Sequence, residues 1–269
     1  MEFNISRIKN ILNKNYTYYD QYKAKFRYDK RLNTDIKSFL KSQIKDKNKV
    51  LDVGCGDGHT LINLSDYFNE GIGVDNNKSN IKKAKENSRS INKVSFVVAP
   101  SYDLPFSKSE FDFIFSERGP ISGSNINIQS ALNVLKPGGM LFEETVGELD
   151  SQKINEFFQR GQQYSKYKHM NRVDEVKVLF ERNGIDIRII NNLISYIIFP
   201  DIYEWLKYQC PVWSYTGVDF PTVNKIKEFY FCNKNNNERG EIIITRHRIW
   251  IGGIKQHNPP QYWVFKHFE

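Results

Sequence analysis

The stretch from Val50 to Thr60 reads Val-Leu-Asp-Val-Gly-Cys-Gly-Asp-Gly-His-Thr. Its apolar start predicts a buried strand, and the run over residues 60–68 predicts the helix that follows. Between them glycine recurs at every second position, as it does where a backbone takes positive φ or where a ligand comes closer than a Cβ allows. The stretch therefore predicts a ligand-binding turn between a strand and a helix N-terminus, at the carboxyl edge of a parallel sheet.

The spacing of these glycines separates two classes of ligand. A dinucleotide fingerprint, Gly-x-Gly-x-x-Gly, that begins at Gly54 and Gly56 needs a third glycine at position 59, which is His59. The third glycine is instead Gly58, and the stretch resembles motif I of the class I S-adenosylmethionine (SAM)-dependent methyltransferases, Asp-x-Gly-x-Gly-x-Gly. An ordinary glycine-rich turn is the structural alternative. The SAM-binding residues that the resemblance implies here are Asp52, Gly54, Cys55, Gly56 and Gly58.

A second short strand, residues 71–75, ends in Asp75 about 20 residues beyond the turn. A carboxylate at this place in a nucleotide-binding βαβ unit accepts hydrogen bonds from the hydroxyls of a ribose. Asp75 is therefore the expected ribose ligand, with Asn76 beside it. A plain strand-end or helix-capping role for Asp75 is the alternative.

Later motifs extend the resemblance. Leu-Pro-Phe at residues 104–106, Phe-Asp-Phe-Ile-Phe at 111–115 and Leu-Lys-Pro-Gly-Gly at 135–139 follow in the order and spacing of class I methyltransferases. The chain looks most similar to the group that includes the ubiquinone and menaquinone biosynthesis methyltransferases, over about residues 45–145. The resemblance implies a Rossmann-like α/β fold, in which helices cover both faces of a seven-stranded, mostly parallel sheet.

The remaining candidate ligands lie where predicted strands end. In similar methyltransferases the stretch before Leu-Pro-Phe supplies the adenine site; its opening acid is missing here, which leaves Ser101, Tyr102 and Asp103 as candidates. Ser116 opens the exit of the strand predicted at residues 111–115, and it is the last expected cofactor ligand. The cofactor that the resemblance implies is SAM, with S-adenosylhomocysteine (SAH) as product.

Charged residues at the next two strand exits are the candidates for catalysis. Ligands bind at strand exits in a parallel sheet, so Glu117 and Arg118 are expected near the methionine end of the cofactor and the acceptor. Arg118 has the chemistry to hold a carboxylate or phosphate. A base is needed only if the acceptor loses a proton, and the candidates are Glu117, Glu143, Glu144 and His247. The alternative for Glu117 and Arg118 is pairing with other loop residues, and a structural role is the alternative for His247.

Composition and charge indicate the cellular compartment and argue against a membrane span or a metal site. The 269 residues carry a formal net charge of +8, and no run of about 18 apolar residues is present. The N-terminus lacks the order of a signal peptide, and the three cysteines lie far apart, without the spacing of a zinc or disulfide framework. We therefore expect a cytoplasmic protein without a membrane span or a metal, as a monomer or homodimer.

The flanking segments complete the predicted organisation. Residues 1–45 are expected to form a helical cap, and residues 46–269 the methyltransferase domain. An aromatic-rich insert at 200–235, before the last strand at 241–254, is expected to act as a lid. The cap also contains an aromatic patch that would either line a substrate pocket or pack the cap onto the domain: Tyr16, Tyr18, Tyr19, Tyr22, Phe26 and Tyr28.

Three functions fit these features. The first is methyl transfer to a small-molecule acceptor by in-line displacement, favoured by the aromatic segments. The second is methylation of RNA, with ribosomal RNA as one such substrate. Its support is the positive charge and four basic residues near one another in the sequence: Arg160, Lys166, Lys168 and Arg172. The third is a non-catalytic SAM-binding partner or regulatory protein.

Overall fold

The computed structural model describes residues 3–14, 22–27, 35–44, 47–159, 172–215, 217, 219–236 and 240–256. The chain divides into two compact units, each described here by itself. The helical unit comprises Met1–Arg31, Glu148–Met170 and Leu193–His247, and the sheet unit comprises Leu32–Gly147, Asn171–Asn192 and Arg248–Glu269. Strands β7 (Ile185–Phe199) and β8 (Ile242–Lys255) contribute residues to both units.

Eight strands of the described residues form one sheet in the order β1-β7-β8-β6-β5-β2-β3-β4. The other bounds are β1 Lys25–Arg27, β2 Lys47–Val53, β3 Phe68–Asp75, β4 Val94–Val98, β5 Phe111–Glu117 and β6 Leu135–Val146. Strands β2 to β6 pair in parallel, whereas β8 runs antiparallel to β6 and β1 antiparallel to β7. The expected mostly parallel, Rossmann-like sheet is confirmed, and β1 is an additional strand. All three side chains of β1 are exposed, so its sequence lacks the apolar alternation that predicts a strand.

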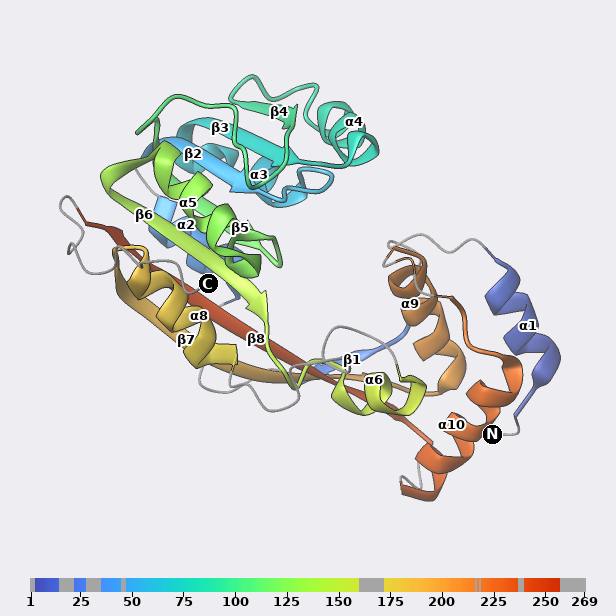
Figure 1. Ribbon diagram of the computed structural model, residues 1–269. Coiled ribbons are helices and arrows are strands. Elements are labelled where there is room, and N and C mark those ends of the chain that lie inside the picture. The colour runs from blue at the N-terminus through green and yellow to red at the C-terminus, as the bar shows by residue number, and fades with distance from the viewer. Residues whose placement is uncertain are drawn as a thin grey trace, which may run out of the picture. The chain divides into compact units, whose positions relative to one another are not determined.

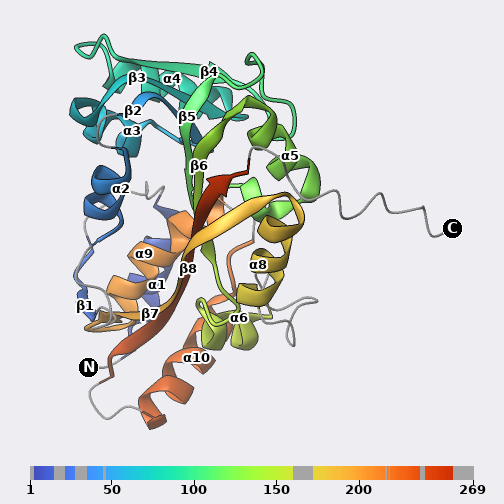
Figure 2. The same ribbon diagram turned by 90° about the vertical axis from the view of Figure 1, so that its left-hand side faces the viewer.

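Helices cover both faces of the sheet unit, with α2 and α3 on one side and α5 and α8 on the other (Figure 2). Their bounds are α2 Ile36–Ile44, α3 His59–Asn63, α4 Lys78–Asn87, α5 Asn125–Val134 and α8 Arg172–Arg182. The predicted extension of α3 to Phe68 is wrong, because a short 3₁₀ turn, Ser65–Tyr67, follows and the buried Phe68 begins β3.

Packing on the two faces keeps the strand ends in register. Leu51, Ile114 and Leu141, from three neighbouring strands, are fully buried in one apolar core, as expected for parallel strands covered on both faces. On the opposite face the Phe39 ring of α2 lies 5.0 Å from the Phe142 ring and 5.1 Å from the Trp250 ring, between ring centroids. The carboxyl ends of β2, β3, β5 and β6 therefore come to one edge of the sheet.

The helical unit contains α1 Ile5–Asn13, α6 Gln152–Phe158, α9 Ile202–Tyr215 and α10 Val223–Asn236 (Figure 1). Its core is aromatic: the Trp205 ring is fully buried, 4.9 Å from Phe229 and 5.7 Å from Trp213 between centroids. Most of the aromatic-rich insert at residues 200–235 lies in the two helices α9 and α10. Buried aromatic residues occur on several sides of α9, so the single apolar stripe that predicts a helix is missing. The cap expected over residues 1–45 is divided, with α1 here and α2 in the sheet unit.

Candidate functional site

The glycine turn after β2 has the backbone that its sequence predicts. Gly54, Gly56 and Gly58 all have positive φ, at 82°, 56° and 79°. A Cβ on Gly58 would lie 2.6 Å from the Phe96 ring, so only glycine fits between this turn and β4. A Cβ on Gly56 would meet no heavy atom within 4 Å. The middle of the turn thus presents bare backbone to open space, which is the property expected where a ligand approaches closely.

Asp75, at the end of β3, fastens the turn. Its Oδ2 accepts a hydrogen bond from the Gly56 amide at 3.0 Å, and its Oδ1 accepts from the Asn77 amide at 2.8 Å and from Asn80 Nδ2 at 3.4 Å. An ionised carboxylate accepts about four hydrogen bonds, so these three leave room for another donor. The structure thus shows the strand-end role of Asp75, and its contact with a ribose stays a prediction. Asn76, next to it, is exposed.

Three acids from neighbouring strand ends influence one another at this edge. The side chain of Asp52 is 2% exposed, and its pKa is raised well above the usual range by burial and by the charges of Glu117 and Asp75. Burial also raises the pKa of the Cys55 thiol, with Asp52 and Asp75 adding to the effect, so this cysteine is held as the neutral thiol. A cation placed among these acids would favour the ionised form of Asp52.

The turn after β5 lies directly against the glycine turn. The Ser116 hydroxyl, fully buried, donates to the Val53 carbonyl at 2.5 Å, which joins the ends of β5 and β2. A Cβ on Gly54 would lie 2.9 Å from Cδ of Pro120. Ser116 therefore supports the two turns, and its hydroxyl proton is already committed to the main chain.

Glu117 and Arg118 lie between Ser116 and Pro120, two residues through which the turn after β5 contacts β2 and the glycine turn. Glu117 Oε2 accepts a hydrogen bond from the Thr60 hydroxyl at 2.7 Å, which ties it to the first turn of α3. The Arg118 amide donates to the Glu144 carbonyl at 2.7 Å, and Arg118 has a φ of 57°, in the left-handed region. A residue other than glycine held there costs about 1–3 kcal/mol. Thr60 had no predicted role, although its position at the start of a helix beside the glycines was a signal.

Glu143, a candidate base, is enclosed instead. Its side chain is fully buried, its Oε2 accepts from the Ser122 amide at 2.9 Å, and its Oε1 has no hydrogen-bond partner. Burial raises the pKa of Glu143 to about 8, although Ser122 and Arg172 act to lower it. Glu143 is therefore protonated at neutral pH and fastens the segment that follows β5.

We expect Glu143→Gln to stabilise the protein progressively as pH rises. The unfolded state loses the Glu143 proton near pH 4.5 and the folded state near pH 8, so burial of this carboxyl becomes more costly across that interval by roughly 1.4 kcal/mol per pH unit. Urea unfolding at pH 5, 6.5 and 8 measures the change. Glu110→Gln is the control, because the Glu110 carboxyl is paired with Lys49 at 2.8 Å and its pKa is lowered. Parallel stability curves for Glu143→Gln and wild type would contradict the assignment.

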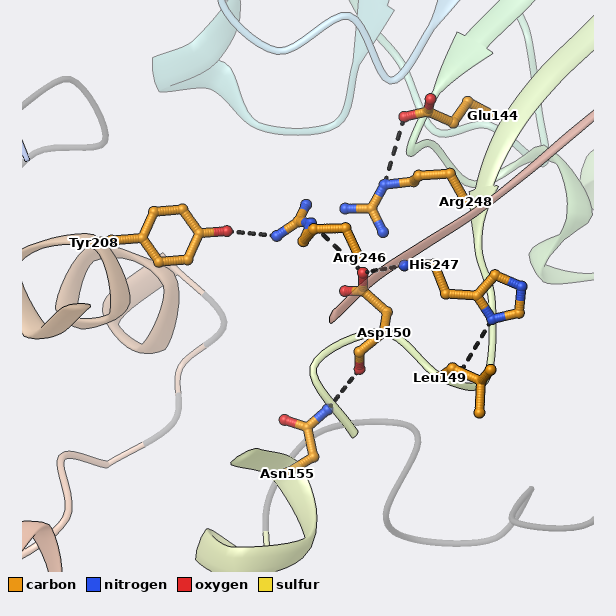
Figure 3. Close-up of polar contacts among 8 residues, drawn as sticks. All are labelled: Glu144, Leu149, Asp150, Asn155, Tyr208, Arg246, His247 and Arg248. Atoms are coloured by element: carbon orange, nitrogen blue, oxygen red, sulfur yellow. Dashed lines mark hydrogen bonds and ion pairs between the residues drawn. The ribbon is translucent and has the colours of Figure 1, made fainter. Parts of the chain in front are cut away.

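Glu144 lies on the other face of β6 and is bound to β8. Its Oε2 accepts from Trp250 Nε1 at 2.7 Å, and its Oε1 lies 3.6 Å from Nε of Arg248 (Figure 3). The Glu144 side chain is 9% exposed. These contacts connect β6 to β8 beneath α2 and give Glu144 a packing role.

His247 belongs to the helical unit. Its Nδ1 accepts from the Leu149 amide at 3.1 Å, and its own amide donates to Asp150 Oδ1 at 2.9 Å (Figure 3). Burial lowers the pKa of the imidazole, against the opposing charges of Glu148 and Asp150, which keeps it neutral. Arg246 binds the same Asp150 carboxylate and the Tyr208 hydroxyl. These contacts favour the structural role for His247.

The adenine candidates lie in the turn between β4 and β5. Ser101 is half-buried, Asp103 is exposed and Tyr102 is 62% exposed. All three occupy the exit of the strand beside β3, which carries Asp75. Their contact with adenine stays a prediction.

Several expectations concern residues outside the described ranges: Tyr16, Tyr18, Tyr19, Tyr28, Arg160, Lys166 and Lys168. Of the aromatic patch, Tyr22 packs 5.2 Å from Tyr208 between ring centroids, inside the helical unit. Of the basic group, Arg172 Nη1 pairs with Glu175 at 2.8 Å. Within the described part of the chain, no three His, Cys, Asp or Glu side chains form a group able to hold a metal ion, and no helix is long and apolar enough to cross a membrane.

Known proteins share this arrangement. Residues 44–184, just over half of the chain, match a family described as "Methyltransferase domain". A demethylmenaquinone methyltransferase of Staphylococcus carnosus is 35% identical over 111 residues, which are 39% of this chain and 46% of that protein. A sterol 24-C-methyltransferase of Pneumocystis carinii is 32% identical over 107 residues, 38% of this chain and 28% of that protein. The chain thus spans less than half the length of these curated relatives.

Solved structures agree on the fold. The YcgJ protein of Bacillus subtilis superposes with a TM-score of 0.60 at 20% identity, over 82% of this chain and 98% of that one. A methyltransferase-like protein of Bacillus halodurans superposes with a TM-score of 0.61 at 17% identity, over 82% and 99%. Because just over half of its residues match the family and its glycine turn has the expected backbone, the chain belongs to the methyltransferase-domain family.

Proposed function

We propose that this protein is a SAM-dependent methyltransferase that methylates a small-molecule acceptor. The observation that carries the proposal is the glycine turn, in which Gly56 faces open space and its amide is held by Asp75. Membership of the methyltransferase-domain family supports the same activity.

The residues at the strand ends fit SAM. Asp75 retains acceptor capacity for a ribose hydroxyl, and the bare backbone at Gly56 allows close approach. Asp52 and Glu117 provide negative charge for the sulfonium and ammonium groups. The turn at residues 101–103 is the place we assign to adenine, one strand farther along the sheet.

The chain's contribution to the reaction is mainly positional. When bound, SAM supplies a methyl group that is already activated by its sulfonium, and in-line attack by an acceptor lone pair leaves the neutral thioether SAH. Held in attack geometry by the glycine turn and the acids, such reactants gain about 7–11 kcal/mol over free encounter. Glu117 is the base that we propose for an acceptor that must lose a proton, because it is half-buried and one oxygen is steered by Thr60. Glu143 is fully enclosed and would need its covering segment to move.

The names of two relatives favour a small molecule as acceptor, since one refers to demethylmenaquinone and the other to a sterol. Methylation of RNA is not advanced, because among the basic residues that suggested it only Arg172 is described, and its guanidinium is bonded to Ser122 and Glu175. The proposed acceptor class is therefore a small metabolite.

Calorimetry with SAM and SAH tests the proposal. We expect both to bind with one-to-one stoichiometry, and SAM to release more protons than SAH at pH values below the Asp52 pKa. The reason is that the sulfonium favours ionised Asp52, whose pKa is raised in the free protein. Affinity for SAM relative to SAH should accordingly rise with pH through the Asp52 pKa. Titrations in buffers of different ionisation enthalpy measure the protons released.

Folded protein that binds neither compound would overturn the proposal. Binding without turnover across a broad panel of small acceptors would favour the non-catalytic alternative instead. Equal proton release with SAM and SAH would remove the sulfonium from the neighbourhood of Asp52 while leaving the cofactor itself in place.

A further inference from the structure

The turn after β5 holds Arg118 in a conformation that its own side chain disfavours. Its φ of 57° lies in the left-handed region, which glycine and asparagine occupy far more readily than arginine. The next residue is glycine, and a Cβ there would lie 1.7 Å from Ser116 Oγ. Such strain persists only where surrounding contacts impose it, and it clusters at ligand-binding sites.

Contacts on both sides impose this conformation. The Arg118 amide donates to the Glu144 carbonyl at 2.7 Å, and the Ser116 hydroxyl binds the Val53 carbonyl at 2.5 Å. Beyond Arg118, Pro120 lies against Gly54 of the glycine turn. The turn that carries Arg118 therefore lies against the glycine turn, and the Arg118 side chain is exposed.

The acids at the carboxyl edge of the sheet explain why binding of an anionic group there would require a cation such as the Arg118 guanidinium. Asp75 and Glu117 attract a positive group and repel a negative one. SAM carries both, because its sulfonium and ammonium accompany a carboxylate. Glu117 and Arg118 are adjacent residues of opposite charge, which matches an amino-acid ammonium and carboxylate or an acidic acceptor held beside the cofactor.

Resting on the proposed function, we infer that Arg118 is an anion-binding residue at the methyl-transfer end of the site and takes a carboxylate or phosphate. The group comes from the amino-acid part of the cofactor or from an acidic acceptor. A guanidinium binds either group through two parallel hydrogen bonds. The strained turn holds Arg118 at this position.

The first arm of the test compares SAH with 5′-methylthioadenosine, which lacks the amino-acid part, in wild type, Arg118→Asn and Arg118→Lys. If the cofactor supplies the anion, Arg118→Asn weakens SAH binding at least tenfold and leaves methylthioadenosine unchanged, with partial recovery in Arg118→Lys. In the second arm, SAH-saturated protein is titrated with benzoate and inorganic phosphate. If the acceptor supplies the anion, Arg118→Asn leaves SAH binding intact and abolishes binding of these probes.

Thermal unfolding provides an independent readout. Arg118→Gly should raise the melting temperature by about 2–4 °C, because it relieves the left-handed strain while removing the guanidinium. Arg89→Asn, at an exposed arginine after α4, is the control and should change neither binding nor stability. Unchanged binding of SAH, benzoate and phosphate in Arg118→Asn would overturn the inference, as would equal weakening of SAH and methylthioadenosine. Absence of SAH binding by the wild type would instead count against the proposed function.

Discussion

Gly56→Val is expected to lower affinity for SAH at least a hundredfold, about 2.7 kcal/mol. The Cβ of residue 56 would enter space that is empty of protein atoms within 4 Å, where the cofactor is proposed to lie against the backbone. The residue also has a φ of 56°, which a β-branched side chain strongly disfavours. Steric blockage and strain therefore act together, and calorimetry with SAH measures the loss.

Gly240→Val separates these two effects. Gly240 has a φ of 68°, and a Cβ there also meets no heavy atom within 4 Å, but it precedes β8 in the helical unit. Both variants should lose about 1–3 kcal/mol of unfolding free energy from the same kind of strain. Only Gly56→Val should lose SAH binding. Normal SAH affinity in Gly56→Val would mean that the turn holds something other than this cofactor.

Asp75→Ala is expected to weaken SAH binding at least tenfold, about 1.4 kcal/mol. The substitution removes the proposed ribose acceptor and also the bonds that hold the Gly56 and Asn77 amides. A control is Asp112→Ala at the opposite end of β5. Asp112 accepts hydrogen bonds from the Lys49 amide at 2.9 Å and from Lys136 Nζ at 2.8 Å. The Asp112→Ala variant should therefore lose stability without losing SAH affinity.

A modified nucleoside distinguishes contact with the sugar from support of the turn. Methylthioadenosine should bind wild type better than its 2′-deoxy analogue does, and Asp75→Ala should reduce that difference. If the difference persists in Asp75→Ala, the carboxylate acts only through the glycine turn. Unchanged affinity for both nucleosides would contradict either role.

The central sheet could be predicted because its residues act locally. Parallel strands buried on both faces read as short apolar runs, and β2 and β5 do so. Glycine at 54, 56 and 58 is needed for positive φ, a property of the residue itself. Helix caps such as Asn77, which accepts from the Ser79 amide at 2.8 Å, also act within a few residues.

Elements without a local signal were missed. β1 has three exposed side chains and exists because it pairs with β7, some 170 residues away in the sequence. The helix α9 buries aromatic residues on several sides, so its pattern lacks one apolar face. The division of the N-terminal helices between two units likewise depends on contacts distant in the chain.

The sequence by itself determined the glycine turn, the acid one strand away and the family that they indicate, because these depend on residue type and short spacing. Only the tertiary structure decided what each candidate side chain does. It enclosed Glu143 as a protonated acid, committed the Ser116 hydroxyl to Val53 and placed Arg118 on a strained turn against the glycines. Burial and hydrogen-bond partners come from segments distant in the sequence, so no local pattern can reveal them.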